Sequence, residues 1–295
     1  MNAAVLLGLL SALGYGVTDY LSRIAGRAVG VWRSLFWGDL PPLLLLSLWF
    51  LHDPAASRFS FAGHPAAWVA AIVSGVIFLG SAAALTRGLM GGTLAVVAPV
   101  AASYGAITAL LSAAAGERLS GKAALGIAVT VVGVCVVSIP AAGDAVAGRT
   151  PGFREHARAS GLGWGIAAAL GYGVGFWLQG AYVVPTLGPF LPAWLSYAIA
   201  VGLLALLHRP LGISMRFPLR NQLAPVMATG FFSVAAFVAL TLGLVTGRVA
   251  VVVVLSSLAS AVTVIMARVI DKASVARHQW LAIATIIWGL ILIKG

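Results

Sequence analysis

Residues 13–17 read Leu-Gly-Tyr-Gly-Val, and the same five residues return in the same order at positions 170–174. The two copies stand 157 residues apart, and the same offset pairs Trp37 with Trp194. Because apolar letters repeat easily by chance, the argument depends on the matches keeping their order along the chain. That order predicts that the chain contains one structural unit twice.

Further matches place the boundary between the two copies. Leu-Ala-Val-Val at 94–97 corresponds to Val-Ala-Val-Val at 249–252, at an offset of 155 residues. The longest polar stretch of the chain, residues 142–160, lies between the two series of matches. We therefore expect a first repeat at 1–141, a polar linker at 142–160 and a second repeat at 161–295.

The composition surrounding these matches is that of a membrane protein. Of the 295 residues, 61% are hydrophobic and only 8% are charged, whereas about 25% are charged in a soluble globular protein. A soluble enzyme or a disordered protein is excluded, because neither could keep so much apolar surface from water. The one cysteine, Cys135, lies in an apolar run, so neither an intrachain disulfide nor a cysteine-based metal cluster is expected.

Apolar runs long enough to cross a bilayer recur throughout the chain. One helical crossing takes about 20 apolar residues, and lipid offers no hydrogen bonds, so each crossing must satisfy its own backbone as a helix. The predicted spans are 3–22, 32–51, 66–86, 93–115, 122–140, 161–183, 189–208, 222–243, 249–267 and 278–294.

These spans predict an all-α integral membrane protein with ten transmembrane helices. Each repeat holds five spans, and an odd number reverses the second repeat relative to the first. The repeats are therefore expected to be inverted five-helix units. Such symmetry suits a carrier, because two copies of one fold can exchange conformations and expose a central site to each side in turn.

Basic residues indicate the orientation in the membrane. The net charge is +11, and the arginines and lysines lie at the ends of apolar runs, which favours membrane orientation over nucleic-acid binding. The connections after spans 1, 3, 5, 7 and 9 carry thirteen of these residues, against five on the other side. The positive-inside rule places the richer side in the cytoplasm. We expect a multi-pass protein of a bacterial inner membrane with both termini non-cytoplasmic, and a first span that is retained rather than cleaved as a signal peptide.

Several of these features together resemble one family of carriers. They are the Gly-Tyr-Gly of residues 14–16, Leu-Ala-Val-Val-Ala-Pro at 94–99, and Gly-Glu-Arg-Leu-Ser at 116–120 followed by Gly126 and Gly133. With the two five-span repeats, they make the chain similar to EamA-type members of the drug/metabolite transporter superfamily over almost its whole length. The resemblance implies a ten-helix secondary carrier, usually an exporter of amino acids, metabolites or drugs, with a central cavity between the halves.

Two positions depart from the pattern of that family. Tyr15-Gly16 stands where Trp-Gly is common, and Val254 replaces the proline expected opposite Pro99. The identity of the solute does not carry over from the resemblance, because the family spans many solutes.

Asp39 is the deepest acidic residue of the predicted spans. It lies seven residues into the second span and precedes Pro41 and Pro42, which remove backbone donors and are expected to kink the helix. An ionisable group at the centre of a membrane helix costs roughly 2.5–3.5 kcal/mol. Asp39 could hold a proton or a substrate ammonium, or it could be a structural acid bonded to a neighbouring helix.

Asp19 lies near the predicted cytoplasmic end of the first span. Arg23 and Arg27 follow at spacings that place all three side chains on one helical face. They could form an interfacial ion pair with extended arginines, or a gate that opens when the cavity faces inward. The repeat mates of Asp19 and Asp39 are Phe176 and Ser196, so any acid-based coupling is expected to reside in the first half.

Aromatic and polar residues within the spans are candidates for the wall of a substrate cavity. An apolar site with a few polar groups suits a small amphipathic solute, and an aromatic face can hold a cationic amine. The predicted cavity residues are Tyr15, Trp37, Asp39, Tyr104, Trp177, Gln179 and Ser256. Pro99 is expected to kink the fourth span and open a carbonyl at mid-depth.

Signatures of catalysis are missing from the sequence. It has no His-Glu-x-x-His, no Gly-x-Ser-x-Gly and no acid-rich magnesium cluster. Gly116 to Lys122 resembles a phosphate-binding loop, but Ala123 stands where a hydroxyl should hold magnesium. We therefore expect no enzyme, no catalytic residue, no metal and no cofactor.

Three functional hypotheses remain, and the carrier is favoured. An intramembrane enzyme acting on a lipid lacks a motif, and a non-transporting scaffold would not explain the deep acids or the duplication. The expected partners are a small-molecule solute, the lipid bilayer and either a proton or a counter-solute. The sequence leaves energy coupling and oligomeric state open, a homodimer included.

Overall fold

The fold was analysed in a computed structural model, which describes residues 3–52, 64–117, 121–137, 161–272 and 277–293. These described residues form helices and no strands. The helices before residue 138 are α1 (Ala3–Val29), α2 (Val31–His52), α3 (Pro65–Gly91), α4 (Leu94–Ala101), α5 (Tyr104–Ala114) and α6 (Gly121–Val137). Those after residue 160 are α8 (Leu162–Leu178), η2 (Gln179–Val183), α9 (Val184–Leu187), α10 (Phe190–Leu207), α11 (Arg220–Leu244), α12 (Val249–Ser256), α13 (Ala259–Ile270) and α14 (Arg277–Ile293).

Within this described part, eight helical segments are long and apolar enough to cross a membrane. Large apolar side chains also face outward: Leu51, Leu206 and Val269 are 80%, 72% and 71% exposed. Such surfaces are stable only in an apolar solvent. The chain is therefore a multi-pass integral membrane protein. The remaining apolar helices, α6 and α14, have 17 residues each, and the predicted linker at 142–160 lies outside the described residues.

Two predicted spans prove to be broken helices. The predicted span 93–115 forms α4 and α5 with a break at Ala102 and Ser103, and 249–267 forms α12 and α13 with a break at Ser257 and Leu258. The two breaks occupy matching positions, since Ala102 and Ser257 are 155 residues apart. The second break has no proline, so the break does not depend on Pro99.

Backbone hydrogen bonds explain both breaks. The Ser103 amide donates to the Val100 carbonyl at 3.1 Å, and the Leu258 amide donates to the Leu255 carbonyl at 3.2 Å. Each of these amides bonds the carbonyl three residues before it instead of four, which tightens the turn. The carbonyl four residues before each amide therefore loses its usual helical donor. In the second half, the Ser257 hydroxyl donates to that carbonyl, Val254, at 2.7 Å.

The predicted span 161–183 continues further than expected. Beyond α8, the five residues of η2 form a π-helical turn, and α9 extends the helical path to Leu187. A π-helical turn inserts an extra residue into the helix and redirects the side chains that follow. Gln179 begins this turn, and its position is described with the site below.

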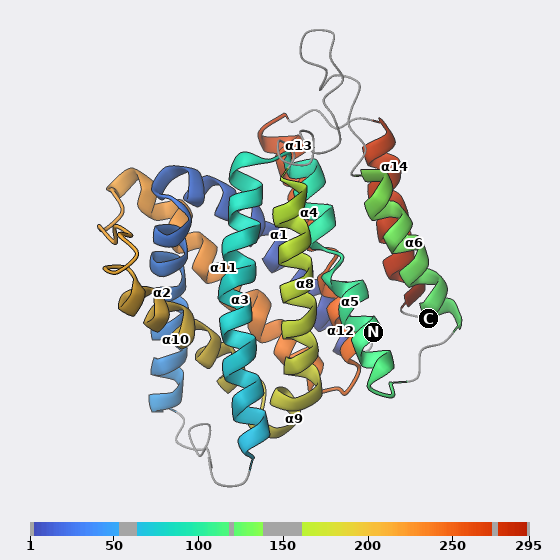
Figure 1. Ribbon diagram of the computed structural model, residues 1–295, viewed down its shortest axis with the longest axis horizontal. Coiled ribbons are helices and arrows are strands. Elements are labelled where there is room, and N and C mark those ends of the chain that lie inside the picture. Colours follow the sequence, from blue (N-terminus) through green and yellow to red (C-terminus); the bar gives the residue numbers. More distant parts are fainter. Residues whose placement is uncertain (1–2, 53–63, 118–120, 138–160, 273–276, 294–295) are drawn as a thin grey trace.

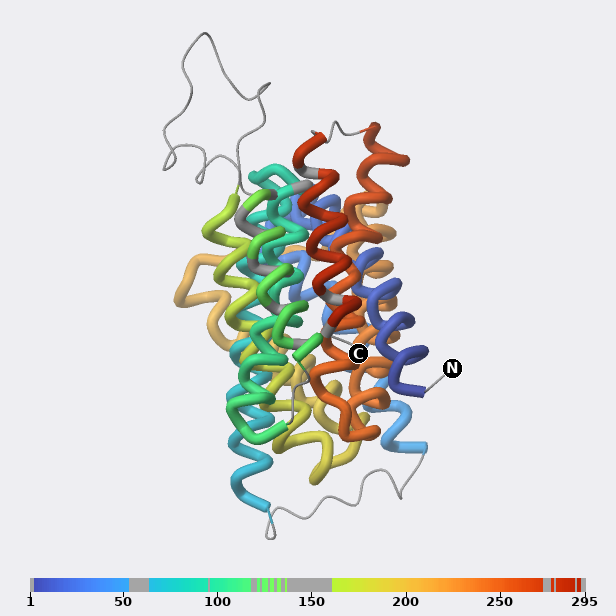
Figure 2. The backbone as a smooth tube through the Cα atoms, turned by 90° about the vertical axis from the view of Figure 1, so that its right-hand side faces the viewer, coloured from blue at the N-terminus to red at the C-terminus, as the bar shows by residue number. Residues whose placement is uncertain are grey.

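Helices from opposite halves of the sequence pack side by side. In Figure 1, α3 lies beside α8, and α6 lies beside α14 at the right-hand edge of the view. Figure 2 shows the α6–α14 pair from the other direction. The helix α1 packs along α11, α2 packs against α10, and α5 packs against α12. In both views the ends of the chain lie away from the end at which α13 leads to α14.

One interhelical hydrogen bond occurs in both halves. Thr263 of α13 donates to the Gly16 carbonyl of α1 at 3.1 Å, and Thr108 of α5 donates to the Gly173 carbonyl of α8 at 2.9 Å. The two threonines are 155 residues apart and the two glycines 157 residues apart, so the offsets are those of the sequence repeat. A threonine hydroxyl can reach a neighbouring helix in this way only where glycine keeps the backbones close.

Close glycine contacts recur with the same offsets. At Gly8, Gly14 and Gly16 of α1, an added Cβ would come within 2.8 Å of a side chain on a helix of the second half. The equivalent glycines of α8 meet the equivalent residues of the first half. Gly8 contacts Leu255, and its repeat mate Gly165 contacts Val100. Gly14 contacts Ala236, and its repeat mate Gly171 contacts Ser81. Gly16 contacts Val262, and its repeat mate Gly173 contacts Ile107.

The helix α2 continues through Pro41 and Pro42. A proline has no amide hydrogen, so Pro42 leaves the Gly38 carbonyl without its helical donor. Gly230 of α11 packs against this carbonyl, because a Cβ at Gly230 would lie 1.9 Å from the Gly38 oxygen. The prolines predicted as a kink therefore lie where α2 and α11 approach most closely.

Candidate functional site

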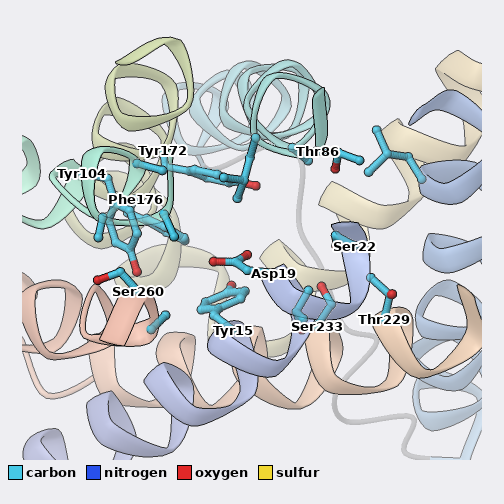
Figure 3. Close-up of a pocket in the computed structure, with 18 of the residues that line it drawn as sticks. Tyr15, Asp19, Ser22, Thr86, Tyr104, Tyr172, Phe176, Thr229, Ser233 and Ser260 are labelled. Atoms are coloured by element: carbon cyan, nitrogen blue, oxygen red, sulfur yellow. The ribbon is translucent and has the colours of Figure 1, made fainter. Parts of the chain in front are cut away.

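An open cavity lies between helices of the two halves, with about 750 Å³ of empty space that includes a part continuous with open solvent. The helices α1 to α5 contribute to its wall, and so do α8, α11 and α13. Figure 3 shows the Asp19 carboxylate projecting into this space between Tyr15 and Tyr172. Small residues such as Ala82 and Ala98 line other parts of the wall and leave room for a solute.

Aromatic rings form one side of the cavity. The Tyr172 and Phe176 rings of α8 are stacked with centroids 5.8 Å apart, and the Tyr104 ring of α5 lies 5.2 Å from Phe176. Tyr15 of α1 lies 6.3 Å from Phe176. These four residues, called the aromatic wall below, hold one another in place through offset and tilted ring contacts.

Two carboxylates face the same cavity. Asp19 comes from α1 and Asp39 from α2, and both line the space. The described residues that line it include no lysine, arginine or histidine, and neither carboxylate forms a hydrogen bond or ion pair with another described residue. The cavity therefore presents two acidic groups without a basic side chain in its own described wall.

Hydroxyl groups complete the polar part of the wall. Thr86 of α3 lines the cavity with an exposed fraction of 2%, and its hydroxyl has no hydrogen-bond partner among the described residues. Ser22, Ser233 and Ser260 also line the cavity, and Figure 3 shows them around Asp19 with Thr86. These hydroxyl groups can form hydrogen bonds with a ligand in the cavity.

A second cavity of about 480 Å³ adjoins the first. It shares Tyr15, Asp39 and Phe176 with the first cavity, and its own wall includes Phe78 and Phe237. Asp39 thus lies where the two spaces meet, and the second space is more apolar in its lining.

Both helix breaks contribute to the cavity wall. Ala101 and Ala102 line it at the first break, and Ala259 and Ser260 line it at the second. Backbone carbonyls that have lost their helical donors are tolerated at membrane depth only where they line a cavity or are buried in protein. The breaks therefore bring residues of α4, α5 and α13 to the same wall.

Four residues predicted for the site lie together in this cavity. They are Tyr15, Asp19, Asp39 and Tyr104. The predicted residue Ser256 lies behind the wall, fully buried, where its hydroxyl is 3.3 Å from the Tyr104 hydroxyl and 2.8 Å from that of Ser11.

Trp37 does not line the cavity. Its indole nitrogen donates to the Met215 carbonyl at 3.3 Å, and its ring contacts Phe217 edge-on at 4.9 Å. Both partners belong to the connection between α10 and α11. Trp37 therefore holds that connection against α2, which is a structural contact.

Trp177 and Gln179 also lie away from the cavity. The Trp177 ring contacts Tyr182 edge-on at 5.6 Å. The Gln179 side chain is fully buried, and its amide nitrogen donates to the Ser74 hydroxyl of α3 at 2.7 Å. Gln179 thus joins the π-helical turn to α3.

Arg23 reaches a partner that its helix spacing did not indicate. It forms an ion pair with Asp271, which also accepts a hydrogen bond from the Tyr20 hydroxyl at 2.8 Å. Arg27 donates instead to the Met90 carbonyl, at 2.9 and 3.0 Å. The contacts of Arg23 and Tyr20 join the end of α1 to the end of α13, and we call them the α1–α13 latch.

Most residues of the wall were not among the predicted site residues, and Tyr172, Phe176 and Thr86 are three of these. A signal existed for Tyr172, because it is the repeat mate of Tyr15 and occupies the matching Gly-Tyr-Gly motif. The repeat offered a signal for Phe176 as well, because Phe176 is the repeat mate of Asp19. Thr86 carries no comparable signal, because its approach to the cavity depends on how α3 is rotated.

A metal site is not evident in the described residues. No group of three or more histidine, cysteine, aspartate or glutamate side chains there could hold a metal ion. The two cavity carboxylates by themselves supply too few ligands for a protein site of either magnesium or calcium.

Comparison with known proteins supports the fold alone. No family model matches the chain, and no curated protein matches it. Fourteen chains of solved structures do match. One of them, described only as a crystal structure of a protein, shares 19% sequence identity and superimposes with a TM-score of 0.72 over 99% of this chain and 98% of its own.

Proposed function

We propose that this protein is a secondary carrier that moves a small solute across the membrane by alternating access. The observation that supports the proposal is the cavity between the halves, whose wall holds the unpaired carboxylates Asp19 and Asp39. Charged groups at membrane depth are costly and mark solute or ion pathways in most membrane proteins. A scaffold would have no use for them.

The carrier is built, in this proposal, from two inverted five-helix repeats. The matched hydrogen bonds of Thr108 and Thr263 support this, and so do the matched glycine contacts and the two helix breaks. Broken helices that meet near the midplane at a repeat interface are the usual binding site of carriers with inverted repeats. Both breaks of this chain line the cavity.

The architecture is consistent with an EamA-type exporter of the drug/metabolite transporter superfamily. The resemblance rests on residues 14–16, 94–99 and 116–120 together with the repeat. A bacterial inner membrane is the proposed location, with the connection between α13 and α14 in the cytoplasm because the connections at that end hold most of the lysines and arginines. Both termini would then be non-cytoplasmic.

The proposed transport cycle uses the α1–α13 latch as its cytoplasmic gate. Arg23 follows directly after the cavity residue Ser22, so the latch begins where the cavity wall ends. Opening it would separate α1 from α13 and admit the solute. The repeat mate of Arg23 is Gly180, which has no side chain to form an ion pair, so the latch has no charged counterpart at that position.

The direct test is solute flux in vesicles that contain only the purified protein. We expect saturable exchange of at least one class of small solute, and we expect Asp39→Asn to slow it by about tenfold or more, because a charge contact within a membrane contributes more than about 1.4 kcal/mol. Glu117→Gln is the matched control, since Glu117 lies at the end of α5 outside the cavity.

Three results would contradict the proposal. The first is absence of flux for every solute class in vesicles whose protein is folded and inserted. The second is wild-type flux in an Asp19→Asn, Asp39→Asn double variant. The third is product formation from a membrane lipid, which would favour an enzyme.

A further inference from the structure

The charge and shape of the cavity restrict the class of solute. Asp19 and Asp39 contribute two carboxyl groups to the wall, and its described lining has no basic side chain. Charges interact strongly in a medium of low dielectric constant. A cation entering this space can therefore pair with a carboxylate and stabilise its ionised form, whereas an anion of the same size finds no basic partner in the described wall.

Basic residues near one end of the cavity are engaged elsewhere. Arg23 pairs with Asp271, and Arg27 donates to a backbone carbonyl. Arg87 of α3 lies over the rings of Trp32 and Trp164, at 5.7 and 5.4 Å from their centroids. Since each of these arginines has a partner of its own, none of them neutralises the cavity carboxylates in the observed arrangement.

The aromatic wall surrounds one of the two carboxylates. Figure 3 shows Asp19 between Tyr15 and Tyr172, with Tyr104 and Phe176 beside it. An ammonium group placed against the Asp19 carboxylate would face several rings, and each ring face attracts a cation within about 6 Å of its centroid. Aromatic cages combined with a carboxylate are a common means of holding alkylated amines.

The rest of the cavity suits an apolar body with a few polar atoms. The unpartnered hydroxyl of Thr86 offers one hydrogen bond. Beyond Asp39, the adjoining 480 Å³ space is lined by Phe78 and Phe237. Together the two spaces have the mainly apolar lining with a few polar groups that suits a small amphipathic molecule.

We propose that the solute of this protein is an organic cation, whose ammonium group binds between the Asp19 carboxylate and the aromatic wall while its apolar body extends past Asp39 toward Phe78. The proposal rests on the proposed carrier function, because it names the class of solute for that same cavity. Asp19 is a binding residue here, and Asp39 lines the path of the apolar body.

Binding to the purified protein is the first arm of the test. Three probes share one ring and nearly one length: phenethylamine, phenethyl alcohol and 3-phenylpropanoate. We expect phenethylamine to bind at least about tenfold more tightly than the other two, the difference that one charge-assisted contact produces. Asp19→Asn should remove this preference, Asp19→Glu should restore most of it, and Glu117→Gln should leave it unchanged.

Flux in vesicles is the second arm. Trimethyl(phenethyl)ammonium is permanently charged and does not cross lipid unaided, so its entry reports the protein. Phenylalanine, which has the same ring with no net charge, is the comparison solute. We expect saturable flux of the ammonium probe that Asp19→Asn reduces by about tenfold or more, with thermal unfolding of the variant used to verify its folding.

The two arms separate the solute class from the carrier function. Tighter binding of phenethylamine without flux of either solute would contradict the carrier and leave the cation site intact. Flux of phenylalanine without binding or flux of either cation would contradict the cation site and leave the carrier intact. Equal binding of the three phenyl probes, or wild-type cation binding by a folded Asp19→Asn variant, would overturn the proposal.

Discussion

Single residues decide how closely the helices of this protein approach one another. Gly230 of α11 packs on the Gly38 carbonyl of α2, which has no helical donor because Pro42 follows four residues later. The partner atom belongs to the backbone, so it cannot move aside as the tip of a flexible side chain can. The contact lies next to Asp39 and Thr229, two residues of the cavity wall.

Gly230→Ala tests this contact. We expect the substitution to destabilise the protein by about 1–3 kcal/mol, the usual cost of overpacking a close interface. Gly202→Ala is the matched control, because Gly202 lies within α10 with no neighbouring atom inside 4 Å of an added Cβ. Reversible unfolding in mixed detergent micelles measures both variants, and equal stability of the two would contradict the close contact.

The Asp19 carboxylate shows what residue-level prediction achieved. The sequence identified Asp19 and Asp39 as the intramembrane acids, because a charged residue stands out in an apolar run. It suggested Arg23 as a partner of Asp19 because four residues separate them on one helix. The tertiary structure instead pairs Arg23 with Asp271, which is 248 residues away.

At the scale of elements, the α1–α13 latch joins the ends of two helices from opposite halves. Arg23 and Asp271 are 19% and 34% exposed, so their ion pair contributes little to global stability. Tyr20 adds a hydrogen bond to the same carboxylate. A contact of this strength can be broken in each transport cycle, whereas a deeply buried ion pair could not be broken so easily.

Arg23→Gln should open the latch with little loss of stability. We expect an unfolding free energy within about 1 kcal/mol of wild type. We also expect a Ser22→Cys residue to react faster with a membrane-impermeant thiol reagent applied from the α13–α14 side. Arg33→Gln is the control, because Arg33 donates to the Arg216 carbonyl instead. Unchanged reactivity of Ser22→Cys in the Arg23→Gln background would show that the latch does not close the cavity.

The helix breaks form the second feature at this scale. Pro99 lies shortly before the first break, and Val254 occupies the matching position before the second. The helices α4 and α12 nevertheless both end after eight residues. Bonds that span three residues occur at both breaks. We therefore expect that packing around the breaks, and not the proline, maintains them.

Pro99→Ala should consequently preserve the first break. We expect an Ala102→Cys residue to remain reactive toward a small water-soluble maleimide in this variant, because Ala102 lines the cavity at the break. An Ala109→Cys residue is the control, since Ala109 is fully buried within α5. Loss of reactivity at Ala102→Cys would show that the proline, and not the packing, keeps the helix broken.

At the scale of the whole molecule, the two halves interlock instead of standing apart. The helix α1 packs along α11, α8 packs along α3, and α6 packs along α14. Each half therefore supplies part of the surface against which the other is folded. The cavity lies within this arrangement, so it can form only when both halves are present.

Accessibility from the two membrane faces tests the orientation of the whole molecule. In a Cys135→Ala background, we expect Lys272→Cys to be labelled by an impermeant thiol reagent only from the cytoplasm. Thr246→Cys should be labelled only from the opposite side, because residues 246 and 272 flank the broken span formed by α12 and α13. Labelling of both cysteines from one face would show that this span does not cross the membrane. Labelling of Lys272→Cys only from outside the cytoplasm and of Thr246→Cys only from the cytoplasm would contradict the proposed orientation.

Local sequence was sufficient for the helices and for the membrane as their solvent. Apolar runs of bilayer length predict helices wherever they occur, since lipid leaves the backbone no other partner. The predicted span 32–51 differs from the observed Val31–His52 by one residue at each end. The exceptions are the breaks at Ala102 and Ser257, which lie inside apolar runs where serine alone interrupts the run at the break, at Ser103 in the first and at Ser256 and Ser257 in the second.

The tertiary structure alone decided which side chains share the cavity. Tyr15, Asp19, Asp39 and Tyr104 meet there, whereas Trp37 turns toward Met215. The physical reason is that helix formation in lipid depends on residues within one turn of each other, while the direction that a side chain faces depends on the rotation of its helix against neighbours far away in the chain. The sequence determined the elements and their solvent, and packing between the halves determined the site.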